Sequence, residues 1–295
     1  MIAIDWGGSS LRAYRMSDVG AIIERRNSPA GIFRPASRPF GACLDALVGD
    51  WFDGGEAEVV MSGMIGSRNG WAEAPYLPCP ARLADLATGG RDVEWGSRRA
   101  WIAPGLVCRA ADGAADVMRG EEVQVLGLAN QLPDSALICL PGTHTKWVEA
   151  SGGTITGFRT AVTGELFGLF QAGSSLLAPA QDQRPIDPQW FAAGLERADR
   201  LGGILQHLFG VRAGQLVGDL SDTAAASFLS GILVGHDVAN APVEGCVVHL
   251  LGATELVSLY QVALARRGVA FRILDPDAAA TGLFALARAR TALAQ

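Results

Sequence analysis

An acidic residue followed at once by a glycine-rich turn is the first group in the sequence that could do chemistry. Asp5 ends the apolar run 2–4, and the turn Gly7-Gly8-Ser9-Ser10 leads into a second apolar segment that begins at Leu11. Glycines let backbone N–H groups approach a phosphate, hydroxyls can hydrogen-bond to it, and a carboxylate can hold its metal ion. The pattern predicts a site for a phosphate and a divalent cation.

The same pattern recurs in the second half of the sequence. The apolar run Ile138–Leu140 precedes the turn Pro141-Gly142-Thr143-His144-Thr145-Lys146, and Trp147 begins a new apolar segment. A further hairpin follows each copy, at residues 20–23 and 153–156. We interpret the repeat as an internal duplication, with two similar halves facing each other across a phosphate.

Lysine occurs once in the sequence, inside the second glycine turn. The chain has 24 basic residues, and all except Lys146 are arginine. A compact ammonium group on a flexible stem can reach a phosphate as a point charge. The alternative is an ordinary surface lysine. Its place in the turn favours phosphate binding.

Two further regions carry candidate residues. Residues 62–71 are dense in glycine, which predicts a loop, and Arg68 within it could bind a substrate carboxylate or simply be solvated. Glu121 and Glu122 follow Gly120 at a predicted helix start. Acidic residues there are explained by the helix dipole, but a carboxylate is also what a base acting on a hydroxyl requires.

Alternating strands and helices are expected to position these residues, which indicates an α/β fold. Strands are predicted at 2–4, 11–16, 58–61, 98–103, 138–140, 247–251 and 269–274, and helices at 39–51, 123–128, 163–170, 191–208, 220–234, 254–267 and 277–294. Thr163 and Thr254 are the expected N-caps of their helices, and 181–188 is expected to be a polar loop. We expect one domain at 1–133 and another at 134–276, with the final helix, 277–295, packing on the first.

Composition excludes several classes of protein. A hydrophobic share of 49% with 18% charged residues is typical of a compact folded chain. No apolar run approaches the roughly 18 to 20 residues of a membrane span, so we expect a cytoplasmic protein without membrane contacts. A net charge of -6 without a basic block argues against nucleic acid as a partner. The five cysteines lack a CxxC pair and the four histidines are scattered, which predicts neither disulfides nor a zinc site.

Six segments, taken in order, resemble one family. The order of the turns is similar to that of the sugar kinase/heat-shock ATPase/actin superfamily, and the segments together resemble the 2-dehydro-3-deoxygalactonokinase family. They are Asp5–Arg12, Met61–Arg68, Trp71 with Ala74–Pro78, Asp116–Glu122, Leu140–Trp147 and Thr163–Phe167. The resemblance runs through essentially the whole chain and weakens over 181–219. It implies two ribonuclease H-like α/β domains with an ATP cleft between them.

The resemblance implies an ATP- and Mg²⁺-dependent kinase of galactonate degradation. Its substrate would be a small sugar acid, 2-dehydro-3-deoxy-D-galactonate, phosphorylated on the 6-hydroxyl to give 2-dehydro-3-deoxy-6-phospho-D-galactonate and ADP. The choice between galactonate and gluconate series rests wholly on the resemblance. An exopolyphosphatase-like phosphohydrolase is an alternative, since its Gly-Glu-Glu helix start resembles residues 120–122. A non-enzymatic nucleotide-gated binding protein is another. The oligomeric state stays open, and a homodimer is compatible with the resemblance.

The resemblance also implies roles for individual residues. Asp5 would hold Mg²⁺, Lys146 would act on the transferred phosphate, and Glu121 matches the base best, with Glu122 and Asp116 as alternatives. The nucleotide would be bound by Gly7, Gly8, Ser9, Ser10, Arg12, Gly142, Thr143, His144, Thr145, Gly252 and Ala253. The sugar acid would be bound by Ser62, Met64, Arg68, Arg119, Thr163 and Glu165, with Arg68 and Arg119 as candidates for its carboxylate. A hydrogen bond from His144 to its own backbone is the alternative for that residue.

Overall fold

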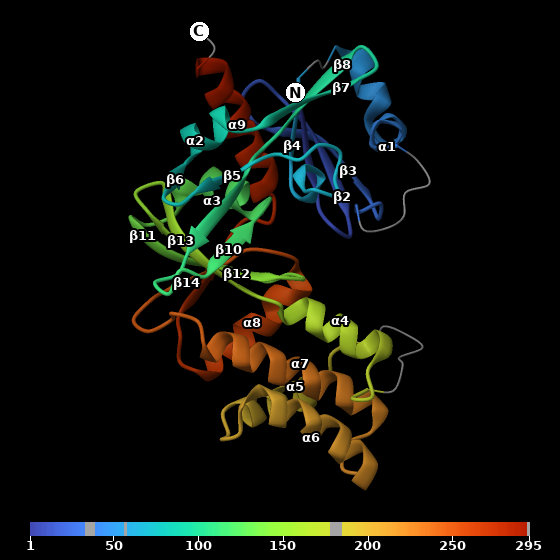
Figure 1. Ribbon diagram of the computed structural model, residues 1–295, viewed down its shortest axis with the longest axis vertical. Helices are drawn as coiled ribbons and strands as arrows, with labels where there is room; N and C mark the ends of the chain where they lie inside the picture. The colour runs from blue at the N-terminus through green and yellow to red at the C-terminus, as the bar shows by residue number, and fades with distance from the viewer. Residues whose placement is uncertain (33–38, 56–57, 178–184, 294–295) are drawn as a thin grey trace. The chain divides into compact units, whose positions relative to one another are not determined.

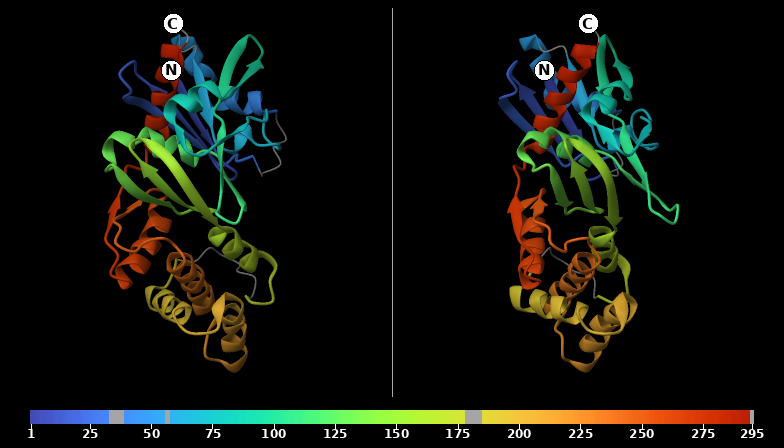
Figure 2. Two further views of the ribbon diagram at one scale, coloured as in Figure 1. Left: turned by 60° about the vertical axis from the view of Figure 1, so that its left-hand side comes forward. Right: turned by 90° about the vertical axis from the view of Figure 1, so that its left-hand side faces the viewer.

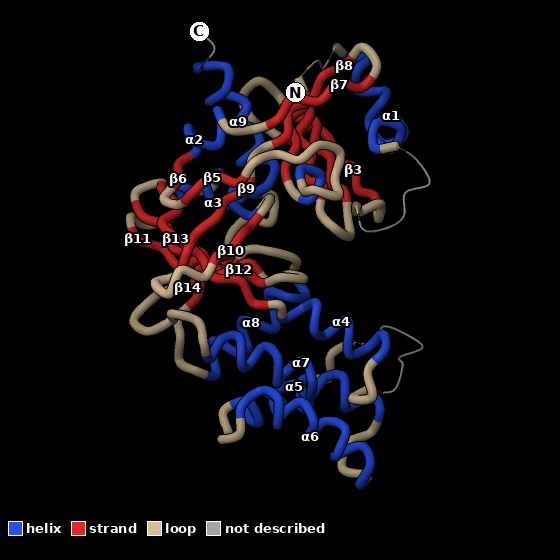
Figure 3. The backbone as a smooth tube through the Cα atoms, in the orientation of Figure 1, coloured by secondary structure: helices blue, strands red, loops and turns tan. Residues whose placement is uncertain are grey.

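A computed structural model of the chain describes residues 1–32, 39–55, 58–177 and 185–293 (Figure 1). It divides into two compact units. Unit 1 consists of Met1–Ala136, Val148–Arg159 and Asp275–Gln295, and unit 2 consists of Leu137–Trp147 and Thr160–Leu274. The chain combines mixed sheets with helices, as Figure 3 shows, and the predicted α/β fold class is confirmed.

Unit 1 is built on a six-stranded sheet of order β3-β2-β1-β4-β8-β7 and a small sheet of order β10-β9-β5. Their strands are β1 (Ile2–Trp6), β2 (Leu11–Met16), β3 (Ile22–Ser28), β4 (Val59–Ser62), β5 (Tyr76–Pro78), β7 (Arg91–Trp95), β8 (Arg98–Ile102), β9 (Gly105–Arg109) and β10 (Ala115–Met118), while β6 (Ala81–Arg82) belongs to the third sheet. The helices are α1 (Phe40–Val48), α2 (Leu83–Thr88), α3 (Glu121–Gly127) and α9 (Ala278–Leu293), with 3₁₀ turns η1 (Gly49–Gly54), η2 (Met64–Gly66) and η3 (Ala129–Gln131).

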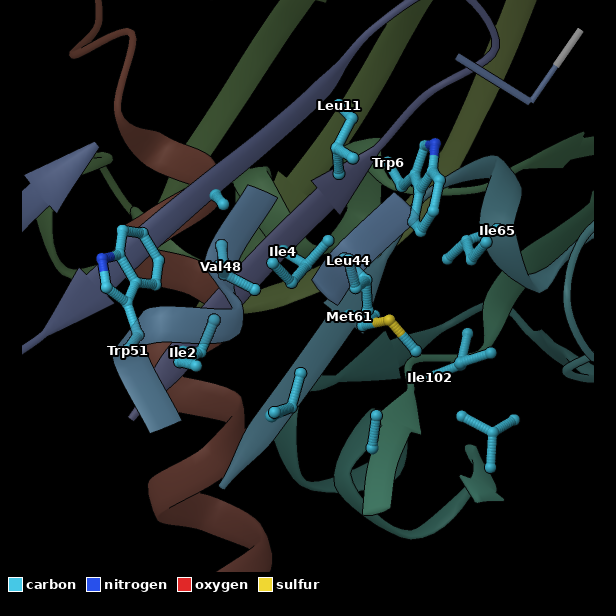
Figure 4. Packing of buried hydrophobic residues seen from close by; sticks show 14 of the residues in the cluster. Ile2, Ile4, Trp6, Leu11, Leu44, Val48, Trp51, Met61, Ile65 and Ile102 are labelled. Atoms are coloured by element: carbon cyan, nitrogen blue, oxygen red, sulfur yellow. The ribbon is translucent and has the colours of Figure 1, made fainter. Parts of the chain in front are cut away.

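A cluster of buried apolar side chains lies between the large sheet of unit 1 and α1. β1 is buried at all five positions, as expected of a central strand whose sequence is almost wholly apolar. Ile4 and Met61, from neighbouring strands, pack with Leu44 of α1 and with Trp6 and Ile102 (Figure 4). This packing holds the carboxyl ends of β1 and β4 rigidly, and the candidate residues Asp5 and Ser62 stand at those ends.

The last helix packs within unit 1 against α3 and against β1 and β4 (Figure 1). The two helices cross where glycines meet: a Cβ added to Gly127 would lie 2.3 Å from Gly282 Cα, and one added to Gly282 would lie 2.0 Å from Val123 O. Only glycine permits such a close approach of two backbones. The crossing sets the position of α3, which carries the two candidate glutamates at its head.

The third sheet repeats the strand order of the first sheet. The third sheet has the order β15-β14-β11-β12-β13-β6. Its strands are β11 (Ser135–Leu140), β12 (Thr145–Ser151), β13 (Thr154–Ala161), β14 (Val248–Leu250) and β15 (Phe271–Ile273), besides β6. The order β13-β12-β11-β14-β15 matches β3-β2-β1-β4-β8, and β14 is parallel to β11 as β4 is to β1. The predicted internal duplication is therefore confirmed.

Helices make up most of the rest of unit 2. They are α4 (Thr163–Gly173), α5 (Pro188–Ala198), α6 (Gly203–Val217), α7 (Asp222–Ala239) and α8 (Thr254–Arg266). α5 and α7 lie side by side (Figure 2) and cross at glycines, because a Cβ added to Gly194 would lie 2.9 Å from Gly231 Cα. None of the described helices is both long and apolar enough for a membrane span.

Several local predictions were wrong. A single helix at 191–208 is replaced by α5 and α6, because Gly202 and Gly203 adopt positive φ angles of 127° and 70° and interrupt the helix. Thr163 and Thr254 are not N-caps; Val162 and Ala253 occupy that position, and neither makes a side-chain cap bond. The small sheet of β5, β9 and β10 was not predicted. Of the predicted loop at 181–188, residues 181–184 lie outside the described part, and Pro188 begins α5.

Candidate active site

Asp5 stands at the carboxyl end of β1, in unit 1. β2 pairs with β1 in antiparallel register and places Arg12 opposite Asp5, so that Arg12 Nη2 donates to Asp5 Oδ2 at 2.5 Å. Asp5 is 6% exposed. Burial raises the pKa of its carboxyl and the Arg12 guanidinium opposes this change, while the charge of Glu121 adds to it. The structure thus brings two predicted residues, Asp5 and Arg12, into direct contact.

The first glycine turn connects β1 to β2. Gly7 N donates to Ser10 O at 2.9 Å, which closes the turn. Gly7 and Gly8 are half-buried, and both serines are exposed. The turn therefore presents its hydroxyls to solvent beside the buried carboxylate of Asp5, which is the arrangement expected of a phosphate turn.

The end of β4 lies beside Asp5. The two strands are parallel, and Ser62 pairs in register with Asp5. Gly63 follows with a φ of 93°. If residue 63 carried a side chain, its Cβ would lie 2.7 Å from Trp6 O and 3.4 Å from Asp5 Oδ1. Ser62 Oγ is fully buried and has no hydrogen-bond partner within the described residues. Met64, the next candidate, is half-buried in η2.

The head of α3 completes this group. Gly120 precedes the helix with a φ of 109°, and a Cβ on it would lie 3.0 Å from Gly63 Cα. Glu121 is half-buried, and its Oε2 accepts a hydrogen bond from Arg119 N at 3.1 Å. Glu122 is fully buried, and both of its oxygens accept from Gly120 N at 2.8 Å. Adjacent glutamates therefore have different environments, and only Glu121 keeps access to solvent.

Burial gives Glu122 an unusual titration. Its pKa rises from 4.5 to about 8 because burial disfavours the charged form and the charge of Glu121 adds to this effect. The folded chain then holds a proton that the unfolded chain has lost between pH 4.5 and 8, so this group's contribution to stability falls across that range and is constant above it.

Replacing Glu122 with glutamine should flatten the pH dependence of stability. The free energy of unfolding of the wild type should fall relative to that of Glu122→Gln between pH 5 and pH 8.5, by about 1.4 kcal/mol for each unit of pKa shift, and its melting temperature should fall with it. Thermal unfolding followed by circular dichroism at both pH values measures the difference. Glu94→Gln, at an exposed ion pair with Arg99, is the matched control, and its melting temperature should depend on pH as that of the wild type does. Parallel slopes for Glu122→Gln and the wild type would contradict the prediction.

The candidate arginines of unit 1 differ in burial. Arg68 has a side chain that is 87% exposed, and its Nε lies 3.8 Å from Glu73 Oε1. Arg119 is 6% exposed, stacks over the ring of Tyr76 at 4.2 Å and donates from Nη2 to Ala74 O at 2.7 Å. Its Nε and Nη1 are buried without a hydrogen-bond partner in the described part of the chain. Unmet donors on a buried guanidinium indicate a place where an anionic group can bind.

Asp116, the remaining alternative base, lies apart from these residues in the secondary structure. It belongs to β10, in the small sheet, and its Oδ1 accepts from Val117 N at 2.7 Å. It is half-buried. The structure therefore gives Glu121, at the helix head, the more direct relation to Asp5.

The second glycine turn, in unit 2, is followed by β12. Thr145 and Lys146 are buried there, at 0% and 3% exposure, and Lys146 Nζ donates to His144 O at 3.0 Å. A Cβ on Gly164 would lie 2.3 Å from Gly142 O, so the first turn of α4 packs directly on the phosphate turn. The predicted residue Thr143 is exposed.

His144 and Glu165 form a pair at this turn. His144 Nε2 lies 2.8 Å from Glu165 Oε2, and both side chains are nearly half exposed. Glu165 N also donates to Thr143 O at 2.8 Å. The hydrogen bond from His144 to its own backbone, weighed as an alternative, is replaced by this side-chain contact. Glu165, which was predicted to bind the sugar acid, contacts the predicted phosphate turn.

A cavity of about 1080 Å³ opens beside the second turn within unit 2. Its walls come from the turn and from α4, α5, α7 and α8, and include Gly142, Thr163, Phe167, Phe191, Leu233 and Leu259. The volume is sufficient for a nucleoside-sized ligand. Gly252 and Ala253 are not among the lining residues; they stand just before α8, whose Glu255 and Leu256 do line the cavity.

Sequence reasoning missed Asp237, a buried carboxylate of α7. It accepts hydrogen bonds from Trp147 Nε1 and Thr163 Oγ1 at 2.8 and 2.7 Å, and from the hydroxyl of Tyr260. An acidic residue within the long apolar run of α7 was the available signal, since a buried charge requires partners.

The architecture and the two glycine turns define a class, the α/β fold of actin-like ATPases and sugar kinases. At the level of fold alone, the chain is similar to component A of the (R)-2-hydroxyglutaryl-CoA dehydratase of Acidaminococcus fermentans. That solved structure has a TM-score of 0.52 and 13% identity, and the match covers 100% of this chain and 99% of that one.

The family follows from closer matches. The model of the 2-keto-3-deoxy-galactonokinase family matches residues 5–286, and the chain belongs to this family. It is 39% identical to the 2-dehydro-3-deoxygalactonokinase of Escherichia coli K12 over 90% of each chain. It is also similar to a solved protein of Sinorhizobium meliloti assigned as a 2-dehydro-3-deoxygalactonokinase, with a TM-score of 0.85, 36% identity and 98% of each chain covered.

Proposed function

We propose that the chain transfers the γ-phosphoryl group of ATP to the 6-hydroxyl of 2-dehydro-3-deoxy-D-galactonate, giving the 6-phosphate and ADP. Family membership over nearly the whole chain supports this reaction. The structural observation that supports this reaction is that Asp5, the end of β4 and the head of α3 come together in unit 1. An acid beside a phosphate turn, Asp5, therefore lies near a solvent-accessible glutamate, Glu121. Phosphoryl transfer gains mainly from positioning and charge neutralisation, which these groups can supply.

Magnesium is the metal that this donor set suits. Mg²⁺ is usually bound through one or two carboxylates together with substrate phosphates and water, and Asp5 is such a carboxylate. The described residues contain no cluster of three or more His, Cys, Asp or Glu that could hold a metal by themselves. We propose that Asp5 holds a Mg²⁺ ion brought with ATP, directly or through water. The ion would neutralise phosphate charge.

The residues of each unit have separate tasks in this proposal. The cavity of unit 2 would take the adenosine, and the turn that carries Lys146 would take the phosphates. In unit 1, Glu121 would accept the proton of the 6-hydroxyl as that oxygen attacks the γ-phosphorus. The first turn, Gly7 to Ser10, would bind phosphate oxygens, and Ser62 and Met64 would contact the sugar acid.

Arg119 is expected to bind the carboxylate of the sugar acid, and Arg68 is the matched control. Arg119→Lys should raise KM for the sugar acid roughly 10-fold to 100-fold, because lysine cannot replace a bidentate guanidinium contact worth about 1.5 to 3 kcal/mol. Arg68→Lys should stay near wild type, because its side chain is 87% exposed and its guanidinium lies beside Glu73. Initial rates at varied sugar acid measure both values. An unchanged KM in Arg119→Lys would remove this residue from the substrate site.

A homodimer is a further proposal, supported by the surface of α6. Leu201, just before the helix, and Leu205 and Phe209 within it are 97%, 82% and 63% exposed and recur every four residues. Leu205 and Phe209 are four residues apart within α6 and so lie on one face of the helix, and large exposed apolar side chains on one face favour helix–helix association. Sedimentation should show a dimer that Phe209→Glu dissociates. A wild-type monomer at micromolar concentration would contradict the proposal.

Coupled ADP release with Mg-ATP tests the reaction itself. The galactonate-derived acid, its gluconate epimer, plain hexoses and no acceptor are offered in parallel. We expect turnover with the galactonate-derived acid to be well above turnover with its gluconate epimer. Equal turnover with both epimers would keep the kinase and discard the narrow substrate. ADP release without acceptor would indicate the phosphohydrolase, and no release under any condition would indicate the nucleotide-gated binding protein.

A further inference from the structure

The carboxylate of Asp237 joins four elements around the second phosphate turn. Asp237 lies on α7 and is 9% exposed. Its three donors come from different elements, Trp147 from β12, Thr163 from the start of α4 and Tyr260 from α8. One buried side chain therefore ties α7 to all three. All of these residues belong to unit 2.

The directions of the hydrogen bonds extend this network by one residue. A carboxylate that meets three donors acts as an acceptor, so the Tyr260 hydroxyl gives its proton to Asp237. The Tyr260 oxygen can then accept from Thr145 Oγ1, which lies 2.8 Å away. Thr145 is fully buried and its hydroxyl is engaged in this way. Its contribution to the phosphate turn is therefore to anchor the backbone.

The network holds the residues on both sides of Lys146. Thr145 and Trp147 precede and follow it in β12, and side chains alternate between the two faces of a strand. Since both neighbours reach the network on one face, Lys146 is directed to the other face. Its Nζ donates to His144 O within the turn.

The same carboxylate also holds the start of α4. Thr163 Oγ1 donates to Asp237 Oδ2 at 2.7 Å. The next residue, Gly164, packs its backbone against Gly142 of the turn. Loss of the acceptor would therefore release the helix start that supports the turn, together with the strand that carries Lys146.

We propose that Asp237 is a positioning residue that fixes Lys146 and the start of α4 in the geometry that receives the phosphates of the nucleotide. This inference rests on the proposed function, because it takes the second turn as the phosphate site. It adds a residue of α7 that acts on the turn through its hydrogen bonds with Trp147, Thr163 and Tyr260.

The test compares Asp237→Asn and Asp237→Glu with the wild type. Asparagine has the same shape, but its amide nitrogen is a donor and cannot accept from the surrounding donors. Asp237→Asn should lower kcat/KM for ATP about 10-fold to 100-fold, as small misplacements of supporting groups do, and should weaken ADP binding in calorimetry. KM for the sugar acid should stay within about 2-fold. Asp237→Glu should recover part of the loss, because it restores the acceptor.

Controls separate positioning from folding. Asp199→Asn, at a surface ion pair with Arg267 in the same unit, should leave all kinetic constants near wild type. A purely structural role for Asp237 would lower the melting temperature while leaving kcat/KM for ATP and ADP binding unchanged, and that result would overturn the proposal. If Asp237→Asn does not fold, Tyr260→Phe provides the test. This change removes the hydroxyl that donates to Asp237 and that links the network to Thr145, and it should weaken ADP binding.

The two proposals fail in different ways. If the wild type shows no ATP turnover with any acceptor, the kinase is wrong, and calorimetry with ADP alone still decides whether Asp237 supports nucleotide binding. If the wild type is active and Asp237→Asn binds ADP as tightly as the wild type does, the positioning role is wrong while the kinase stands.

Discussion

Replacement of Asp5 by asparagine is expected to lower kcat by roughly 10³-fold while the chain stays folded. The buried carboxylate at the end of β1 is the group that we expect to hold Mg²⁺ at the phosphates, and loss of one such electrostatic group costs about this much. Asparagine keeps the shape of the side chain and one oxygen that can accept from Arg12, so the pairing of β1 with β2 should survive. Coupled ADP release and thermal unfolding measure the two effects separately.

Asp18→Asn is the control for this change. Asp18 is an exposed aspartate in the turn after β2, and its replacement should leave kcat unchanged. Titration of Mg²⁺ adds a second reading, because a variant that lacks the metal-holding carboxylate should need more Mg²⁺ for half-maximal rate. An Asp5→Asn enzyme that works within a few-fold of wild type at ordinary Mg²⁺ would show that Asp5 does not hold the metal.

Glu121→Gln is expected to lower kcat by about 10²-fold to 10⁴-fold, the usual contribution of a positioned base. Glu121 is half-buried at the head of α3, and its charge is close enough to Asp5 to raise the pKa of that carboxyl. A base at this position can reach a hydroxyl held near the end of β1. KM for ATP should stay near wild type, because the base acts on the acceptor.

Glu122→Gln provides the comparison, since the two glutamates are adjacent in sequence. Both Glu122 oxygens accept from Gly120 N and the side chain is fully buried, so its loss should affect kcat far less than the loss of Glu121. Asp116→Asn should also stay close to wild type. A larger loss of kcat in Glu122→Gln than in Glu121→Gln would transfer the role of base to Glu122.

Local patterns predicted the elements that carry the site. The apolar run before Asp5 and the glycines after it specify a buried strand and a tight turn, and both are set by residues close in sequence. The second copy at 138–147 was predicted for the same reason, and the matching strand orders confirm the duplication. By contrast, the helical spacing of apolar residues in 191–208 continues through Gly202 and Gly203. The positive φ angles of these two glycines interrupt the helix, although the hydrophobicity pattern does not change there.

Long-range packing determines what the sequence could not show. Arg68 and Arg119 are equivalent as residue types, and only the packing of Arg119 against Tyr76 and Ala74 separates a buried guanidinium from an exposed one. Glu121 and Glu122 are adjacent in sequence, and only the packing of the folded chain leaves Glu121 half-buried and Glu122 fully buried.

The single lysine of the chain has a consequence for experiments on intact protein. A lysine-specific protease has one cleavage site, after Lys146, and the cut divides β12 (Thr145–Ser151) within the second copy of the hairpin. Because Lys146 is 3% exposed, cleavage requires the turn in unit 2 to open first. The rate of that one cut therefore reports local opening at the second turn, in the unmodified chain and without a label.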